Sequence, residues 1–578
     1  NPFFLEELAW AIAERASAHE PASIPETVQG ALLGRIDRLP QARRRLLQTA
    51  SVLGRGCPAR LLRAVWEDAD DMTDHLRELQ RLEFLYERPG VEEPLYVFKH
   101  ALTQEVAYES LPSERRRLLH RRAVGALESL HAERRVEHVD ELAHHAVRGE
   151  LWEQALAYLR QAGARAAARS GFREAAAHLE GALRVLAHLP ESRDVLEQAI
   201  DVRVELRNAL LPVGEEARIF AYLREAEAIA AALGDERRLG TVFLARTFHL
   251  IMMGAHQEAL ECCRRALAVA TAIGSFPLEV RAKYYLGGIY EYLGDYGRAI
   301  ESLRETAARL DGERIREQLG STGYPSVLSR AWLVWCLAEV GEFAEAVARG
   351  EEMVRIAETL DDRYSSIAAY RSVGQTHLNR GDIPAAIAAL ERCVGLLGAA
   401  EFPRWVFGTT TLLGYAYVLS GRLFEAEPLL KQALARETPV RSTHHARLVA
   451  CLGEAYLLAG HRDDAIRLAG RALSLARQRK EHSHEAHALR LLGEIDCRRD
   501  PPDLEQAEGH YRQALELAET LGMRPLAAHC RLGLGRVHGR AGRRPAAEAH
   551  LGAAVLLFRG LDMGYWLEQA ESELEAIP

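Results

Sequence analysis

The sequence predicts a mostly α-helical protein in which a small N-terminal module precedes an α-solenoid with a period of about 40 residues. Three observations predict this fold class. Small residues recur at fixed intervals among large apolar ones, as in LLGYAYVLSGRLFEAEPLLKQAL at 412–434. The first 110 residues follow a different pattern. The composition, with 48% hydrophobic, 27% charged and 7% aromatic residues, is typical of a globular helical chain of this length, 578 residues.

Composition also excludes several classes of protein. No run approaches the roughly 18 apolar residues that span a bilayer. A net charge of −9 is too mild for a nucleic-acid-binding surface over the whole chain. The eight cysteines form no CxxC pair and lie mostly among apolar residues, which predicts buried thiols in a reducing compartment. We therefore expect a cytoplasmic protein with no membrane partner and no nucleic-acid partner.

The N-terminal segments come first in chain order. The stretch NPFFLEELAWAIAERA within residues 1–22 has the pattern of an amphipathic helix, and the missing initial Met predicts a fragment of a longer polypeptide. SIPETVQGALLGRIDRLP, at 23–40, predicts a helix that ends near Pro40. Three short helices follow in QARRRLLQTASVLG, CPARLLRAVWE and ADDMTDHLRELQRL.

A β-hairpin is expected next, because FLYER (84–88) and PLYVFKH (94–100) alternate on either side of PGVEE. Three helices followed by a hairpin indicate a winged-helix domain over 23–110. Residues 111–238 are expected to be linker helices and degenerate helical repeats. GELWEQALAYLRQAGARA (149–166), SGFREAAAHLEGALRVL (170–186) and a looser pair at 195–235 carry that pattern.

The regular array is expected over 239–563, with about eight helix pairs, and a capping helix over 564–578. Its mark is a turn glycine followed five residues later by alanine. Successive alanines lie 40, 47, 40, 40 and 39 residues apart, the 47-residue interval holding the loop IREQLGSTGYPS. One further unit is expected around Ala507. The pairs are Gly254/Ala259, Gly294/Ala299, Gly341/Ala346, Gly381/Ala386, Gly421/Ala426, Gly460/Ala465 and Gly542/Ala547.

A second small residue precedes most of these alanines by twelve positions. Glycine at the turn ends the first helix in the left-handed conformation, and the second small residue lets two helix backbones approach closely. The pattern resembles the tetratricopeptide repeat, with a period longer than the usual 34 residues. The second small residues are Gly287, Gly374, Gly414, Gly453 and Gly535, with Gly493 displaced by a two-residue insertion.

A second resemblance begins at the N-terminus, runs through GELWEQALAYLRQAGARA into the repeats and so covers nearly the whole chain. NPFFLEEL, IPETVQGALLGRIDRLP and FKHALTQEVAYESLPSERRRLLH resemble the region after the nucleotide-binding module of STAND ATPases. These segments are especially similar in sequence to bacterial proteins in which a predicted AAA-type ATPase shares one polypeptide with a class III adenylate or guanylate cyclase domain and tetratricopeptide repeats. That resemblance implies that Asn1, Pro2 and Phe3 belong to the end of the ATPase lid, and that this chain is a regulatory region for signal transduction.

No Gly-Lys pair occurs, so the chain lacks the P-loop GxxxxGK[ST]. No metal-binding aspartate pair of a cyclase is recognisable either. We therefore expect no catalysis by this chain, no cofactor, no metal site and no catalytic residue in it. ATP and Mg²⁺ are expected only in upstream domains of the parent polypeptide.

The candidate binding site is the concave face of the array, which the first helix of each pair should line. Arginine and aromatic residues are typical interface anchors. A protein, a peptide or a small ligand is the expected partner, with the upstream ATPase domain as the internal one. Counting along each first helix gives Arg281, Tyr284, Trp335, Arg371, Gln375, Tyr415, Arg447, Glu454, Arg490 and Glu494.

Two alternatives to the signalling role stay open. A transcription activator of the maltose-regulator type would carry its DNA-binding domain outside this chain, and a plain protein–protein scaffold would not switch. The arginine runs at 43–45 and 115–117 could contact phosphates. The histidines of EHSHEAH (481–487) and HVDELAHH (138–145) do not have metal-site spacing, and both stretches are interpreted as solvated helix starts.

Overall fold

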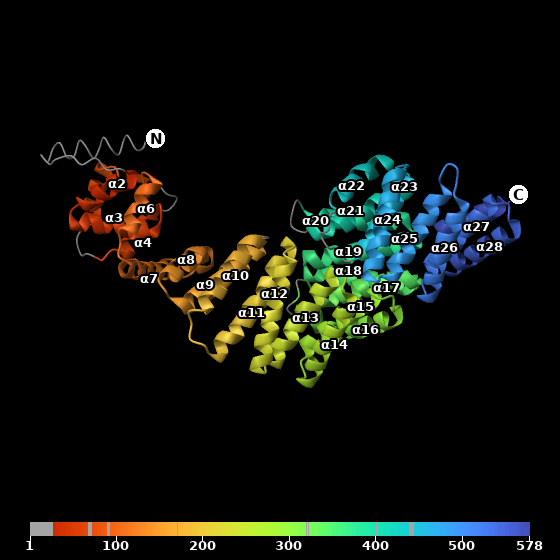
Figure 1. Ribbon diagram of the computed structural model, residues 1–578, viewed down its shortest axis with the longest axis horizontal. Coiled ribbons are helices and arrows are strands. Elements are labelled where there is room, and N and C mark those ends of the chain that lie inside the picture. The colour runs from red at the N-terminus through yellow and green to blue at the C-terminus, as the bar shows by residue number, and fades with distance from the viewer. Residues whose placement is uncertain are drawn as a thin grey trace. The chain divides into compact units, whose positions relative to one another are not determined.

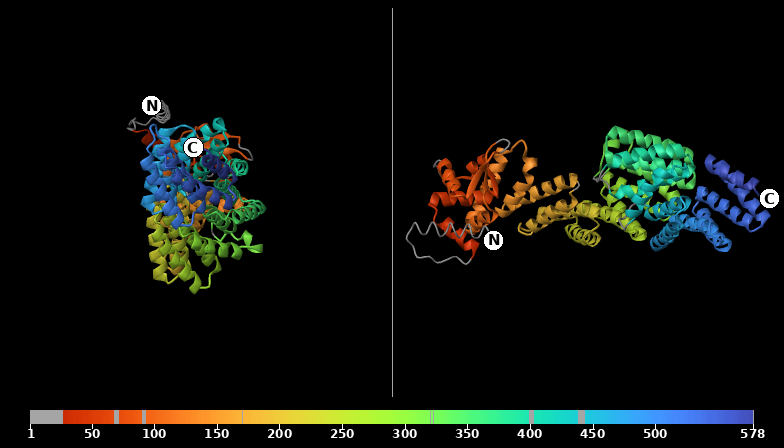
Figure 2. Two further views of the ribbon diagram at one scale, coloured as in Figure 1. Left: turned by 90° about the vertical axis from the view of Figure 1, so that its right-hand side faces the viewer. Right: turned by 90° about the horizontal axis from the view of Figure 1, so that it is seen from above.

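The computed structural model describes residues 27–67, 72–89, 93–169, 171–319, 321, 323–398, 403–437 and 444–577. Residues 1–22, where the end of an ATPase lid is predicted, lie outside this range. The chain forms two compact units that divide after Glu215. Both units are built mainly from helices (Figures 1 and 2).

The first unit opens with four helices and a hairpin, as the sequence predicts. The hairpin is antiparallel and pairs Leu85 with Phe98 and Arg88 with Leu95. A third strand, β1 (Gly56–Pro58), pairs with β3, so the sheet order is β1-β3-β2. The sequence did not predict β1, because three residues ending in proline show no alternation. The other elements are α2 (Val28–Asp37), α3 (Gln41–Leu53), α4 (Ala59–Val65), α5 (Met72–Arg81), β2 (Leu85–Arg88) and β3 (Leu95–Phe98).

Helices alone complete the first unit. The two degenerate repeats predicted from the sequence form α9 and α10, which pack on each other. The looser pair expected at 195–235 is not one hairpin within one unit, because the chain divides between its two helices, α11 and α12. These helices are α6 (Ala101–Glu109), α7 (Ser113–Leu130), α8 (Val139–Arg148), α9 (Trp152–Ala168), α10 (Phe172–Leu186) and α11 (Arg193–Leu210).

The second unit is an α-solenoid. After α12 (Glu216–Leu233), its described helices form eight hairpins and the final helix α29 (Gly564–Glu575). The longest connection, between α16 and α17, holds the short helix η3 (Gly312–Arg316) and accounts for the 47-residue interval. The hairpins are α13 (Glu236–Met253) with α14 (His256–Ala272), α15 (Phe276–Tyr292) with α16 (Tyr296–Arg309), α17 (Pro325–Val340) with α18 (Phe343–Leu360), α19 (Arg363–Arg380) with α20 (Ile383–Leu397), α21 (Pro403–Leu419) with α22 (Leu423–Ala435), α23 (His445–Leu458) with α24 (Arg462–Arg479), α25 (His482–Cys497) with α26 (Leu504–Thr520), and α27 (Arg524–Arg540) with α28 (Arg544–Gly560).

Each predicted turn glycine lies at a bend. Gly381 has φ +92° and its N–H donates to the carbonyl of His377 at 2.9 Å. The N–H of Asp382 donates to the same carbonyl at 2.9 Å, so the two bonds cap the end of α19. A left-handed backbone at this position favours glycine, because a side chain there would be strained.

The second set of glycines brings the two helices of a hairpin into close contact. A Cβ added at Gly374 would lie 2.5 Å from the side chain of Leu390, sixteen residues further on. The same spacing joins Gly287 to Leu303 and Gly535 to Leu551. Gly493 meets Tyr511 at a spacing of eighteen, which matches the two-residue insertion predicted from the sequence. Backbone contact at small residues therefore fixes the shape of each hairpin.

The solenoid curves until its later hairpins contact its earlier ones. One hydrophobic cluster combines Tyr285 and Leu337 of the early helices with Leu489, Leu526 and Cys530 of α25 and α27. The guanidinium of Arg524 donates to the carbonyl of Val340 at 2.9 Å, 184 residues away in the chain. Figure 1 shows α15 and α17 beside α25. The inner face of the early hairpins is therefore covered by the later ones.

All eight cysteines are free and buried, as predicted. Burial raises the pKa of the Cys451 and Cys530 thiols to about 12. Among the described residues no helix combines the length and apolar character that crossing a membrane requires.

Replacing Gly374 tests the close approach within a hairpin. We expect Gly374→Ala to destabilise the second unit by about 1–3 kcal/mol, because the new methyl group must displace Leu390 in a packed core. Gly395→Ala is the matched control, since this helical glycine is exposed and its Cβ would meet no atom within 4 Å. It should be neutral or stabilise by up to about 1 kcal/mol. Thermal unfolding followed by circular dichroism measures both, and equal stability of the two variants would contradict the packing argument.

Candidate functional site

The ten predicted groove residues do not line an open trough. Tyr284, Trp335, Arg371 and Gln375 are buried, with 3–8% of their surface exposed. The other six are half-buried. The expectation of an accessible groove is therefore wrong for the first four, because the curved solenoid covers them with its own later hairpins. The concave face nevertheless holds several buried ionisable groups that contact one another, and we take it as the candidate site.

A chain of buried acids and histidines joins the two ends of this face. Nε2 of His256 lies 2.9 Å from Oε1 of Glu481, and Nδ1 of His484 lies 2.8 Å from Oε2 of the same carboxylate. Nε2 of His444 lies 3.2 Å from Oε2 of Glu291. The second oxygen of Glu291 faces Nε2 of His484 at 3.9 Å. We call these five residues, His256, Glu291, His444, Glu481 and His484, the seam.

Aromatic rings support the seam. The ring of Tyr292 stacks on His256, with centroids 4.5 Å apart, and its hydroxyl accepts a hydrogen bond from the backbone N–H of His444 at 3.1 Å. Trp335 stacks on the other side of His444, with centroids 4.0 Å apart. His444 itself caps α23 with φ +59°, so the chain enters that helix with its imidazole held between two rings. Trp335 thus contacts the seam and is not available to a ligand in this state.

Burial separates the pKa values of the seam groups. The pKa of Glu291 is raised to about 8 because its carboxyl is desolvated and lies near Glu339 and Glu481. His444 has a pKa well below its usual range, chiefly through burial and then through Arg371. Although burial opposes it, the Glu481 carboxylate raises the pKa of His484, and the histidines lower that of Glu481. At neutral pH the seam therefore holds a protonated Glu291 beside the carboxylate of Glu481 and its histidine partners.

A polar branch extends from the seam to Gln375. Nε2 of His487 lies 3.0 Å from Oε2 of Glu339. The other oxygen of Glu339 accepts from the amide of Asn379 at 3.3 Å, and the side chain of Gln375 donates to Asn379 at 2.6 Å. The pKa of His487 is lowered to about 4 by burial and by Arg447, and that of Glu339 is lowered to about 2, where His487 and Arg447 outweigh burial. Gln375 is thus a structural member of this network.

The half-buried part of the face lies on α21, α23 and α25. Arg490 pairs with Glu454. Glu494 accepts from the hydroxyl of Tyr511 at 2.7 Å and from Arg498 at 2.8 Å. Arg447 is different, because it forms no direct ion pair with a carboxylate among the described residues and its Nε is buried without a hydrogen-bond partner. We call Tyr415, Arg447, Glu454, Arg490 and Glu494 the arginine stretch.

The remaining predicted residues do not join this set. Tyr284 packs against Tyr285 and Trp332, with centroids 5.0 and 4.9 Å apart, as a core side chain. Arg281 is half-buried and forms no ion pair in the described part of the chain. Arg371 lies over the rings of Trp335 and Trp405, at 5.8 and 4.8 Å from their centroids, so it approaches the seam from α19.

Both histidine-rich stretches were misinterpreted in part. His484 and His487 are buried in the site, whereas His482 is exposed. In the first unit His145 is buried, with its Nδ1 2.8 Å from Nδ1 of His120, while His144 is exposed. The sequence could not show this, because only the covering hairpins bury His484 and His487. The partners His256, Glu291, His444 and Glu481 were also missed, since no local pattern links residues 225 positions apart.

Asp140, Glu174 and His178 form one further cluster that the sequence did not reveal. Their ligand atoms lie within 4.8 Å of one another in the first unit. However, Arg165 pairs with Asp140 at 3.0 Å and Arg169 with Glu174 at 3.7 Å. These cations already offset both carboxylates, so the cluster does not define a metal site.

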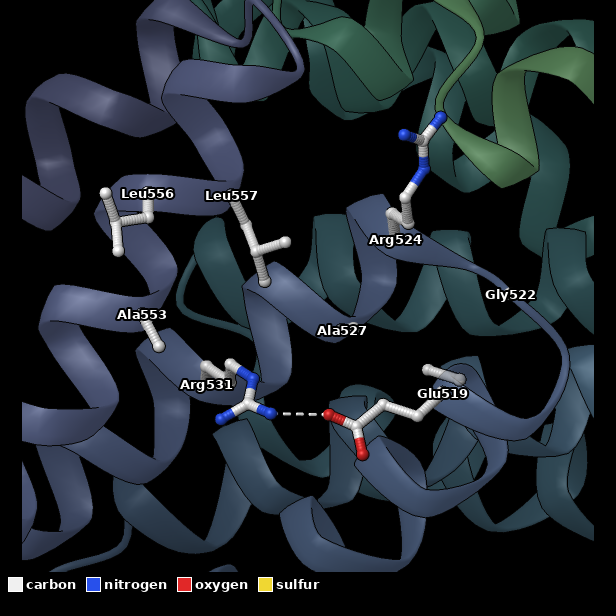
Figure 3. A pocket seen from close by; sticks show the side chains of 9 residues that line it. Glu519, Gly522, Arg524, Ala527, Arg531, Ala553, Leu556 and Leu557 are labelled. Atoms are coloured by element: carbon white, nitrogen blue, oxygen red, sulfur yellow. Dashed lines mark hydrogen bonds and ion pairs between the residues drawn. The ribbon is translucent and has the colours of Figure 1, made fainter.

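A surface hollow of about 500 Å³ lies on the last repeats (Figure 3). Its lining is mostly apolar, with Leu556 and Leu557 on one side and Ala527 at its floor. Arg531 and Glu519, which pair at 2.5 Å, supply its polar edge. It contains none of the predicted groove residues, and its charges are paired.

The arginine runs of the first unit are engaged with acids. Arg43 lies 3.7 Å from Glu78 and Arg44 lies 3.4 Å from Asp37. Arg115 forms a bidentate pair with Glu67, and Arg117 lies 2.9 Å from Glu150. Carboxylates next to these guanidinium groups oppose phosphate binding.

No protein-family model matches the sequence, and the search of curated proteins finds no match. Solved structures do match in fold. The Rap protein complexed with competence and sporulation factor is 14% identical, with a TM-score of 0.48, over 63% of this chain and 98% of that chain. A STAND protein with a tetratricopeptide repeat sensor from Pyrococcus horikoshii is 14% identical, with a TM-score of 0.35, over 72% of this chain and 66% of that one. The human IFIT1 dimer with m7Gppp-AAAA is 15% identical, with a TM-score of 0.39, over 73% of this chain and 90% of that one. At such identities the likeness is one of fold alone.

The His487–Glu339 pair makes stability depend on pH. Both pKa values are lower in the folded protein, so the unfolded chain binds more protons and stability falls as pH drops from about 6.5 to 2. We expect the unfolding midpoint in urea to fall between pH 6.5 and 4, and His487→Gln to flatten this fall, because glutamine does not titrate. A single group contributes at most about 1.4 kcal/mol per pH unit.

His482→Gln is the matched control on the same helix, since His482 is exposed. It should keep the wild-type slope. If His487→Gln also keeps that slope, the pair does not set the acid limit of stability.

Proposed function

We propose that this chain is a non-catalytic sensor region in which the concave face of the solenoid binds a ligand carrying an acidic group. The ligand would be a protein segment, a peptide or a small molecule. The bound state would be relayed through the first unit to an ATPase or cyclase domain of the parent polypeptide. The proposal of such a relay rests on the resemblance to STAND ATPases described above.

The single observation that supports binding is the state of Arg447. Arg490 in the same stretch is paired with Glu454, while this half-buried guanidinium forms no direct ion pair in the described part of the chain and has Glu339 only as a more distant carboxylate. Burying an unpaired cation is unfavourable, and an acidic ligand would remove that cost. Arginine suits the task because its fork binds a carboxylate or phosphate through two hydrogen bonds. Tyr415, half-buried beside it, offers an aromatic surface to the rest of the ligand.

The first unit is proposed to begin with a winged-helix domain. Its helices, its hairpin and the third strand β1 fit that architecture. The ion pairs on its arginine runs favour a protein contact over DNA, and such a contact is what a relay to an upstream domain needs. In this role the module transmits a bias between two states, which requires that the ligand bind one state more tightly than the other.

Binding is tested by a thermal-shift screen of the full chain against a library of short peptides with acidic residues and small carboxylic and phosphorylated metabolites. Any compound that stabilises the chain is then measured by calorimetry. We expect Arg447→Ala to weaken binding by about 10-fold or more, since a charge-assisted hydrogen bond contributes about 1.5–3 kcal/mol.

Arg467→Ala is the matched control, because this exposed arginine of α24 pairs with Asp464, at 3.0 Å. It should bind as the wild type does. The proposal fails if no acidic compound stabilises the chain, or if every compound that binds has the same affinity for Arg447→Ala as for the wild type.

The relay is tested on the full polypeptide by limited proteolysis with and without nucleotide. We expect nucleotide to change the cleavage pattern of residues 27–110, because a domain that reports the ATPase state must alter its contacts. Identical patterns in both conditions would count against a relay through this module.

A further inference from the structure

The seam is placed where the solenoid closes on itself. His256 begins α14 and Glu291 ends α15, while Glu481 and His484 lie at the start of α25. The His256–Glu481 contact spans 225 residues and the His444–Glu291 contact spans 153. Neighbouring hairpins of a solenoid hold each other through local contacts. These contacts are different, because they join hairpins that are several repeats apart.

The seam also contains chemistry that simple packing does not need. Its five side chains are at most 3% exposed, and all of them can gain or lose a proton. A buried pair of this kind is often no more stabilising than apolar side chains of the same size. What it adds is a dependence of the contact on protonation. Breaking one partner leaves an uncompensated charge in the interior, so the contact is either complete or strongly unfavourable.

We propose that the seam is a proton-sensitive clasp that holds the solenoid closed over its concave face and releases it at alkaline pH. This deepens the proposed function, on which its role in ligand access rests, because Trp335 and Arg371 can meet a ligand only when the clasp is open.

The direction follows from the two groups whose pKa values are raised. Glu291 binds its proton more tightly in the closed state, up to about pH 8, and His484 is likewise held protonated. A raised pKa in the closed state means that closure is favoured at low pH and loses that advantage as pH rises through the raised value. Above about pH 8 the ionised Glu291 faces two further carboxylates, those of Glu339 and Glu481.

Cations also lie beside the seam. Arg371 lies near His444, and a guanidinium nitrogen of Arg479 lies 3.9 Å from a carboxylate oxygen of Glu481. Further titratable and charged groups near the seam on the packed helices are Tyr292, Tyr296, Cys336, Glu339, Arg371, His445, Arg447, Arg479 and His487.

The clasp is tested by a distance measured across it. Spin labels at Glu258→Cys on α14 and Gln478→Cys on α24 occupy exposed positions on opposite sides of the seam, and the native cysteines are buried. We expect one short, narrow distance distribution at pH 7 by double electron–electron resonance. At pH 9 the distribution should shift to longer distances, with far-UV circular dichroism unchanged.

Three variants separate the clasp from ordinary packing. Glu481→Gln should give the longer distances already at pH 7, whereas Glu485→Gln on α25, which removes a carboxylate paired with Arg477 of α24, should not. Glu291→Gln stays neutral at every pH and should abolish the alkaline shift. If Glu481→Gln fails to fold, the distances measured at pH 7 and pH 9 in the wild type and in Glu291→Gln still test the clasp.

An unchanged distribution of the wild type at pH 9 would overturn the clasp, as would an equal alkaline shift in Glu291→Gln. These outcomes are distinct from failure of the proposed function. If the chain opens at pH 9 but binds no acidic compound, the clasp is supported and the proposed sensor function is contradicted. If the chain binds an acidic compound through Arg447 but does not open at pH 9, the sensor function is supported and the clasp is contradicted.

Discussion

The close approach of two helix backbones at a small residue is the constraint on which the second unit depends. Gly374 against Leu390 is one instance, and Gly287 and Gly535 repeat it at the same spacing. A hairpin this tight buries its apolar stripe only against the next hairpin, so the units must stack. The angle added at each step then closes the solenoid within about six hairpins, the interval from α14 to α25.

Closure decides the character of the concave face. An open superhelix would leave Trp335, Arg371 and Gln375 to solvent and ligands. Here the later hairpins cover them and bring His444 and Glu481 into the interior. Burial then raises the pKa of Glu291 to about 8, whereas His487 and Arg447 lower the pKa of Glu339 to about 2 against the effect of burial. The contacts among these ionisable groups therefore depend on the curvature of the solenoid, because the partners come from hairpins that are distant in the chain.

This explains what could be predicted from the sequence. The hairpins, their turns at Gly294, Gly381 and Gly421 and the insertion before Ala507 were readable, because each arises from contacts within one or two repeats. The β-hairpin of the first unit was readable for the same reason. The seam was not, because His256 and Glu481 meet only after every intervening crossing angle has been added. For the same reason, four predicted groove residues became interior ones.

The contact between His256 and Glu481 also restricts how such an array can change during evolution. Most repeat proteins gain or lose whole units, since each unit needs only its neighbours. In this chain the deletion of one hairpin between α14 and α25 would move the start of a different first helix opposite His256. Leu526 and Cys530, which share a core with Tyr285, would lose their partners too. The number of repeats in this turn is therefore fixed by geometry, and we expect natural variation in length to occur outside it.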